Sequence, residues 1–263
     1  MRVCILTVGS RGDVQPYVAL AQSLERAGHR TAVCASPAYR SFIESYGVEY
    51  ACVDTGDPQV LLRSPEGQAI FRSTRNPLAL LQGLCRLLEP VLEKGYAEAC
   101  QVSADADALL VAPGALPIAQ ALNESRDLPF ASAFLQPNHP TREFGCWLFP
   151  DPPAWLPFRG RLRRASYRLT WQMLYRIVRG ANDAARRNVL GLGPGVNPFA
   201  AMLQERWPTL YGISSSVLPR PADWGPELEL TGYWFLDRPS GWRPPSVLED
   251  FLASGPKPIC VGF

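Results

Sequence analysis

Apolar residues near the start of the chain come in short, uninterrupted runs separated by turn-forming residues. Three such runs lie at 3–8, 31–35 and 48–53. An apolar run without alternation is typical of a strand covered on both faces, as in a parallel sheet. Amphipathic stretches at 16–27 and 39–45 separate the runs. The pattern predicts consecutive β-α units joined by right-handed crossovers.

The first predicted helix, 16–27, begins with a proline. Pro16 fits there because the N–H groups of the first helical turn have no intrahelical partner. Gly28 follows at the position where helices commonly end. The segment Gly9-Ser10-Arg11-Gly12-Asp13 is therefore predicted to be the turn between the first strand and this helix.

The same alternation continues further along the chain. It predicts a long helix at 78–99 with a bend near Pro90, a strand at 108–111, a helix starting at 116 and a strand at 130–135. Residues 138–158 are different, because prolines and aromatics are too frequent there for regular structure. A long loop inside a compact domain is often functional.

The last hundred residues contain one long helix and several short elements. The helix is predicted at 162–188, with Tyr167, Trp171, Leu174, Tyr175 and Val178 on one face. Short strands are predicted at 208–211, 217–218, 228–231 and 258–263, with a helix at 247–252. We interpret 1–238 as one Rossmann-like, doubly wound α/β domain, 239–254 as an interdomain linker, and 255–263 as the first strand of a second domain that this chain does not contain.

Composition excludes several classes of protein. The chain is 47% hydrophobic and 19% charged with a net charge of +2, which is typical of a globular protein and does not indicate nucleic-acid binding. No apolar stretch of about 20 residues is present to span a membrane. The N-terminus lacks signal-peptide features, and the seven cysteines are scattered, so we expect a cytoplasmic protein with reduced thiols. Two unclustered histidines argue against a zinc site.

The strongest local motif is the segment GSRGD after the first strand. Gly9 and Gly12 let the backbone approach a ligand closely, and the free N–H groups of a helix start favour anions such as phosphate. A tight strand-to-helix turn explains the same residues, and the spacing does not decide between the two. A dinucleotide-binding oxidoreductase does not fit, because its G-x-G-x-x-G fingerprint is absent.

Asp13 supplies the carboxylate of this turn. At the carboxyl end of a strand it would face the crevice where α/β sheets bind ligands, and it could take a proton from a substrate hydroxyl. Aspartate is ordinarily a weak base, so the transfer would have to accompany the departure of a good leaving group. The alternative is that Asp13 caps the helix through its side chain. Both interpretations stay open at this point.

The loop at 138–158 and the residues after it offer two further candidates. His139 follows a strand end, where either a structural or a functional role is compatible with the sequence. Aromatic residues in the loop precede a cationic stretch that consists of Arg159, Arg161, Arg163, Arg164 and Arg168. This combination fits peripheral contact with an anionic membrane surface. It also fits a solvated helix face with aromatics that fill a cleft or the core.

Several motifs, in the same order, resemble one known family. They are ILTVGSRGDVQPYVALAQSLERAGH at 5–29, NHPTREF at 138–144, RRNVLGL at 186–192, LYGISSSVLPRPADW at 210–224 and LTGYWFLD at 230–237. The chain resembles the N-terminal domain of GT-B glycosyltransferases of the sterol glucosyltransferase type (family 28), which are related to glycopeptide-antibiotic glycosyltransferases. The resemblance covers essentially the whole chain.

The resemblance implies an inverting transfer of a hexose from a nucleotide sugar, a UDP-sugar, to a hydroxyl of a sterol, lipid or natural-product aglycone. Asp13 would be the base. Ser10, Arg11 and Gly12 would lie on the donor-phosphate side, and His139, Pro140 and Thr141 would line the acceptor pocket. No metal and no cofactor other than the nucleotide-sugar co-substrate is expected.

We expect the chain to depart from the family in one respect, because its 263 residues are predicted to stop before the donor-binding C-terminal domain. The expected partners are a hydrophobic small-molecule acceptor and, through the missing domain, the nucleotide sugar. Positioning of two substrates supplies much of the rate of a transfer reaction. We therefore expect this chain alone to lack transferase activity. The alternative function is a catalytically inactive module that only binds a hydrophobic acceptor.

Overall fold

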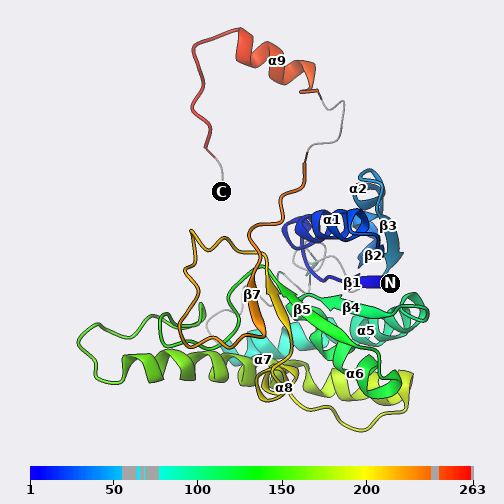
Figure 1. The fold of residues 1–263 in the computed structure, drawn as a ribbon, viewed down its shortest axis with the longest axis vertical. Helices are drawn as coiled ribbons and strands as arrows, with labels where there is room; N and C mark the ends of the chain where they lie inside the picture. Colours follow the sequence, from blue (N-terminus) through cyan, green and yellow to red (C-terminus); the bar gives the residue numbers. More distant parts are fainter. Residues whose placement is uncertain (55–63, 66–67, 69–76, 238–242, 262–263) are drawn as a thin grey trace.

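The computed structural model of the protein describes residues 1–54, 64–65, 68, 77–237 and 243–261. Within these residues seven strands form one parallel sheet, and helices cover both of its faces (Figure 1). The predicted fold class, a Rossmann-like doubly wound α/β sheet, is confirmed. The strand order is β3-β2-β1-β4-β5-β6-β7.

The strands coincide closely with the apolar runs of the sequence. Their bounds are β1 Arg2–Leu6, β2 Arg30–Ala35, β3 Glu49–Cys52, β4 Ala108–Val111, β5 Phe130–Phe134, β6 Thr209–Tyr211 and β7 Leu228–Leu230. β1 lies inside the sheet, with Val3 opposite Thr31 of β2 on one side and Ala108 of β4 on the other. A strand in this position is buried on both faces, which explains why its sequence shows no polar alternation.

Successive side chains of β1 point to opposite faces and enter two separate cores. Val3 and Ile5 pack with α1 (Arg11–Arg26) and α2 (Arg40–Glu44), whereas Cys4 and Leu6 pack on the other face. The helices that contribute to the second core are α5 (Pro77–Val102), α6 (Leu116–Arg126), α7 (Arg159–Leu190) and α8 (Pro198–Glu205). Two 3-10 turns, η1 (Pro37–Tyr39) and η2 (Pro113–Ala115), precede α2 and α6.

The two long helices α5 and α7 are tied together by buried polar contacts. The Tyr96 hydroxyl donates to Asn182 Oδ1 at 2.5 Å. Farther along α7, the buried Arg186 forms an ion pair with Glu124 of α6 and donates through Nε to the Gly193 carbonyl at 2.9 Å. A buried guanidinium is tolerated only when its donors are paired, so these contacts fix the end of α7 against α6 and the loop that follows α7.

The structure corrects two expectations for individual elements and adds a helix that was not predicted. α1 begins at Arg11 rather than at Pro16, so Pro16 lies inside the helix and leaves the Gly12 carbonyl without its helical N–H partner. Residues 217–218 form a turn instead of a strand, because the N–H groups of Val217 and Leu218 bond back to Ser214. α8 was not predicted, although Asn197 accepts from the Phe199 N–H and Pro198 occupies the first helical position.

The predicted strand at 258–263 is not formed in its described part, 258–261. Ile259 and Val261 are 91% and 75% exposed, and no described strand lies beside them to pair with their backbone. The preceding helix α9 (Ser246–Ala253) has no buried residue and lies apart from the sheet in Figure 1. The predicted division into a domain, a linker and a further domain stays a prediction.

Candidate functional site

The strand order creates a crevice between β1 and β4. β1 continues into α1 on one face of the sheet, whereas β4 continues through η2 into α6 on the other face. The connecting loops therefore leave the carboxyl ends of neighbouring strands in opposite directions. Open α/β sheets bind their ligands at such a point.

A cavity of about 220 Å³ occupies this crevice. It is lined by Val8, Asp13, Tyr17, Ala112, Pro113, Gly114, Leu135, Gln136, Asn138, Trp147 and Trp171. The wall is mainly apolar and aromatic, with a carboxylate and two amides as polar exceptions. A site of this composition binds a mostly hydrophobic small molecule and orients it through a few polar groups.

Asp13 lies in the first turn of α1, and its side chain reaches back to the residue that caps the helix. Oδ2 accepts hydrogen bonds from the Ser10 N–H at 2.7 Å and from the Ser10 hydroxyl at 3.0 Å. No described residue hydrogen-bonds to Oδ1. The two interpretations of Asp13 are therefore compatible, since one oxygen holds the helix start while the residue also lines the crevice.

Gly9 makes room for this arrangement. Its φ is +139°, and a Cβ atom at this position would lie 2.2 Å from Asp13 Oδ2. Gly114, on the β4 side, is also closely approached, because a Cβ there would lie 3.2 Å from the Cβ of Val8. The two loops that form the crevice therefore depend on glycine at their points of closest approach.

Tyr17 lines the crevice, but its hydroxyl is already engaged. The buried Tyr17 hydroxyl donates to the Ala133 carbonyl at 2.6 Å, and burial raises the pKa of Tyr17 far above its usual value. The Trp171 indole is engaged too, because its Nε1 donates to the Asn138 carbonyl at 3.2 Å. These two side chains therefore shape the wall and leave Asp13 as the ionisable group that lines the cavity.

The residues predicted for the donor-phosphate side lie around the start of α1. Ser10 is half-buried beside Asp13, whereas Arg11 is exposed, with its guanidinium 4.6 Å from the centre of the Phe42 ring. Gly12 lines a second cavity, of about 400 Å³, on the other side of Leu135. That cavity is lined by Gly12, Gln15, Pro16, Leu135, Gly212, Tyr233, Trp234, Phe235 and Leu236.

The residues predicted to line the acceptor pocket lie behind the crevice wall. His139, Pro140 and Thr141 are buried, and none of them lines the described cavities. The Thr141 hydroxyl donates to Asp223 Oδ1 at 2.6 Å, which anchors the loop to a distant part of the chain. The loop instead presents Gln136, Asn138 and Trp147 to the crevice.

His139 is held against Tyr211. The Tyr211 hydroxyl accepts from the N–H groups of Asn138 and His139, so its own hydrogen is directed to His139 Nδ1, 2.6 Å away. Burial lowers the pKa of His139 to about 4, and Glu227 weakly opposes this effect. His139 is therefore neutral at physiological pH and serves this part of the loop as a hydrogen-bond acceptor.

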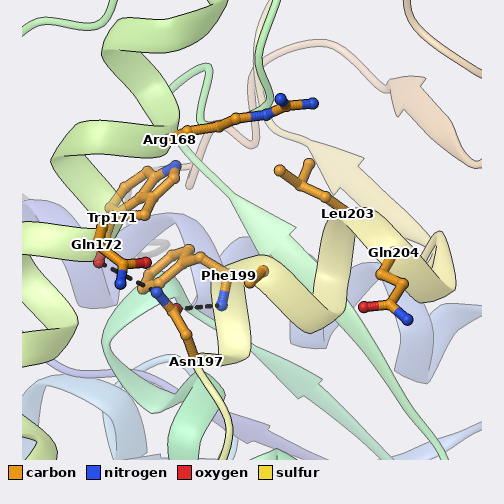
Figure 2. A pocket seen from close by; sticks show the side chains of 8 residues that line it. Arg168, Trp171, Gln172, Asn197, Phe199, Leu203 and Gln204 are labelled. Carbon is orange, nitrogen blue, oxygen red and sulfur yellow. Dashed lines mark hydrogen bonds between the residues drawn. The ribbon is translucent and has the colours of Figure 1, made fainter.

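A third cavity, of about 350 Å³, lies behind Trp171 (Figure 2). Trp171 and Phe199 stack with their ring centres 3.9 Å apart, and Asn197 holds both the Trp171 carbonyl and the start of α8. Figure 2 shows the Arg168 side chain extending past Leu203. Because Trp171 lines both cavities, it forms a shared wall between this space and the crevice.

Two classes of site have no counterpart in the described part of the chain. No group of three or more His, Cys, Asp or Glu side chains is arranged there to hold a metal ion. None of the helices in the same residues combines the length and the apolar character that crossing a membrane requires.

Comparison with protein families gives one match. The model of the glycosyltransferase family 28 N-terminal domain matches residues 3–144. The matched segment includes Asp13 and the loops after β1, β4 and β5 that form the crevice.

Curated relatives match over nearly the whole chain. A sterol 3-beta-glucosyltransferase of Cryptococcus neoformans var. neoformans serotype D is 34% identical over 283 residues, which cover 100% of this chain and 16% of that protein. The O-mycaminosyltylonolide 6-deoxyallosyltransferase of Streptomyces fradiae is 36% identical over 270 residues, which cover 99% of this chain and 60% of that protein. The chain thus spans less than two thirds of either relative.

A solved structure shares the fold. The glycotransferase of kitacinnamycin superposes with a TM-score of 0.53 at 18% sequence identity, and the match covers 93% of this chain and 55% of that chain. At this level of identity the comparison supports the Rossmann-like architecture of the N-terminal half of a GT-B protein.

Proposed function

We propose, because the chain belongs to the glycosyltransferase family 28 N-terminal domain family, that it binds the acceptor for an inverting hexose transfer. The donor is a nucleotide sugar of the UDP-sugar class, and the acceptor is a hydroxyl of a sterol, lipid or natural-product aglycone. The family match across 3–144 and the relatives named for a sterol and for O-mycaminosyltylonolide support this proposal.

The observation that carries the proposal is the position of Asp13 in a largely apolar crevice. Asp13 takes the proton of the acceptor hydroxyl while the hydroxyl oxygen bonds to the anomeric carbon of the donor. The bond from that carbon to the nucleotide diphosphate breaks in the same step, and the diphosphate leaves with the electron pair. A weak base suffices because proton transfer accompanies the departure of a good leaving group.

The donor phosphates are proposed to face the start of α1. Ser10, Arg11 and Gly12 surround the positive end of this helix, which favours anions. Arg11 is exposed and adds a full positive charge. These residues can stabilise the leaving diphosphate without a metal ion, so the reaction requires no cofactor beyond the nucleotide-sugar co-substrate.

Replacement of Asp13 by asparagine tests the proposed base. Asn keeps an oxygen that can accept both hydrogen bonds from Ser10, so α1 keeps its start while the base is lost. In the full gene product, assayed with UDP-glucose and a 3β-hydroxysterol, we expect kcat to fall about 100-fold or more. The acceptor KM should change little, because the crevice wall is unaltered.

Asp127→Asn is the matched control. Asp127 is exposed at the end of α6, with a φ of +52° that asparagine tolerates well. This variant should turn over at the wild-type rate. Near-normal turnover of Asp13→Asn would remove Asp13 from the mechanism, whatever the acceptor proves to be.

A second candidate function is acceptor binding without catalysis. It is favoured by a crevice whose described lining comes from the loops at one edge of the sheet and from α1 and α7. In this case the 263-residue chain binds a hydrophobic acceptor but neither transfers hexose nor hydrolyses a UDP-sugar. Turnover by this chain on its own would contradict this candidate.

Peripheral membrane contact is also part of the proposal. Trp155 and Phe158 are 79% and 69% exposed, so neither fills the core. Arg161 lies over the Phe158 ring at 5.2 Å, and Arg168 is exposed farther along α7. Aromatic side chains next to cations are suited to the interface of an anionic bilayer.

A further inference from the structure

The side-chain amide of Asn138 lies in the crevice without a hydrogen-bond partner among the residues that the structure describes. Asn138 is only 4% exposed, so its amide is largely removed from bulk water. An amide that is nearly buried in a cavity wall and has no protein partner can form a hydrogen bond to a ligand in the cavity. The crevice therefore contains a polar group that a ligand can satisfy.

The backbone of Asn138 is fixed from two directions. Its N–H donates to the Tyr211 hydroxyl at 3.1 Å, and its carbonyl accepts from Trp171 Nε1 at 3.2 Å. Tyr211 ends β6 and Trp171 belongs to α7, and both side chains are buried. The amide is thus held by a rigid support, as a preorganised binding group requires.

The other polar groups of the crevice leave a specific place for this amide. Tyr17 and Trp171 have already used their donors, and Gln136 and Trp147 are exposed. The carboxylate oxygens of Asp13 serve as hydrogen-bond acceptors in this site. The Asn138 amide is therefore a buried group in this wall that can donate to a ligand oxygen.

We propose that Asn138 donates a hydrogen bond to the same acceptor hydroxyl from which Asp13 takes the proton, an inference that rests on the proposed function. A hydroxyl has one hydrogen and two lone pairs. The hydrogen is directed to Asp13 Oδ1, one lone pair receives Asn138 Nδ2–H, and the second lone pair is left to attack the anomeric carbon. Asn138 is thus an acceptor-binding residue that sets the direction of attack.

Binding of two ligands to the 263-residue chain tests this inference. The ligands are a 3β-hydroxysterol and the same sterol without the hydroxyl, and tryptophan fluorescence reports binding because Trp147 and Trp171 line the crevice. The wild type should prefer the hydroxysterol by about 50-fold, and Asn138→Ala should reduce this preference about fivefold, the effect of one neutral hydrogen bond. The anchoring bonds use the backbone of Asn138, so they survive the substitution.

Gln101→Ala is the matched control, because it removes an exposed side-chain amide on α5, outside the crevice, and should keep the wild-type preference. Asn138→Leu, which keeps the branched shape of the side chain, replaces the alanine variant if circular dichroism shows that variant to be unfolded. An undiminished preference in a folded Asn138 variant overturns this inference and leaves the role of Asp13 intact. If the wild type does not bind the hydroxysterol, the proposed acceptor class fails and this inference fails with it.

Discussion

At the scale of single residues, Gly9 and Asp13 occupy adjoining space at the start of α1. A side chain on Gly9 would collide with the carboxylate, since the Cβ would lie 2.2 Å from Oδ2, and the φ of +139° is itself strained for other residues. We expect Gly9→Ala to lower the free energy of unfolding by at least about 3 kcal/mol and to displace Asp13. Urea denaturation measures the first effect, and acceptor turnover of the full gene product measures the second.

Gly28→Ala separates strain from collision. Gly28 also has a positive φ, +89°, but a Cβ there would meet nothing within 4 Å. In this variant the free energy of unfolding should fall only by the cost of the backbone conformation, about 1–2 kcal/mol, and activity should be unchanged. Equal losses of stability and of turnover in the two variants would show that the position of Asp13 does not require the absence of a side chain at residue 9.

Residue roles were predictable from the sequence only where they depend on local geometry. Asp13 follows a strand and starts a helix, and both of its predicted interpretations, cap and crevice residue, agree with its position. Asn138 was not identified, because its orientation is set by Tyr211, 73 residues later. His139 is its neighbour in the same motif, yet the same hydroxyl turns it inward.

At the scale of elements, uninterrupted apolar runs located the strands well, because strands buried on both faces must be apolar throughout. Helix starts were harder to predict. α1 begins five residues before Pro16, because the Ser10–Asp13 pair satisfies the free end of the helix there. A short strand such as the one predicted at 217–218 forms only if its backbone can pair with a neighbouring strand. The N–H groups of Val217 and Leu218 instead bond to the Ser214 carbonyl and close a turn.

The loop at 147–158 and the first turns of α7 form the element proposed to touch membranes. Asp151 binds Arg159 and Arg163, which fastens the loop to the helix and leaves Arg161 and Arg168 exposed. We expect the wild type to bind vesicles that contain phosphatidylserine more tightly than neutral phosphatidylcholine vesicles, and less tightly in high salt. The double variant Trp155→Ser, Phe158→Ser should weaken this binding about tenfold in a vesicle sedimentation assay.

Phe251→Ser is the matched control for the loop. Phe251 is 61% exposed but lies on α9, outside the aromatic and cationic surface. Its substitution should leave vesicle binding unchanged. Equal binding of the wild type to anionic and neutral vesicles would exclude the proposed electrostatic contact.

At the scale of the whole molecule, the sheet brings together groups that are far apart in the chain. The crevice combines residues that follow β1, β4 and β5 with Trp171 from α7. Parallel strands place their carboxyl ends at one edge, so the location of the site was predictable from the β-α alternation. The lining was not, because Trp147 and Trp171 reach the crevice only through the packing of the loop and of α7.

Burial of His139 against Tyr211 makes the stability of the protein depend on pH. The pKa of His139 falls from about 6.5 to about 4 because of burial, so the unfolded chain binds a proton more readily than the folded one. Acid therefore favours unfolding: stability contributed by neutral His139 is full above pH 6.5, declines as the pH falls, and is lost by about pH 4. The full difference corresponds to about 3.5 kcal/mol, at roughly 1.4 kcal/mol per pKa unit, and about 3 kcal/mol of it is lost by pH 4.

His139→Asn isolates this contribution, because its Oδ1 can replace Nδ1 as the acceptor for the Tyr211 hydroxyl and does not titrate. Urea denaturation of both proteins from pH 7.5 to 4 gives the difference in unfolding free energy at each pH, and effects of the carboxylates that both proteins share cancel. We expect the wild type to lose about 3 kcal/mol relative to the variant across this range. If the difference in unfolding free energy between the two proteins does not change with pH, the His139 ring binds a proton equally well in the folded and the unfolded protein. The ring would then be less enclosed by Tyr211 and the neighbouring rings than the structure shows.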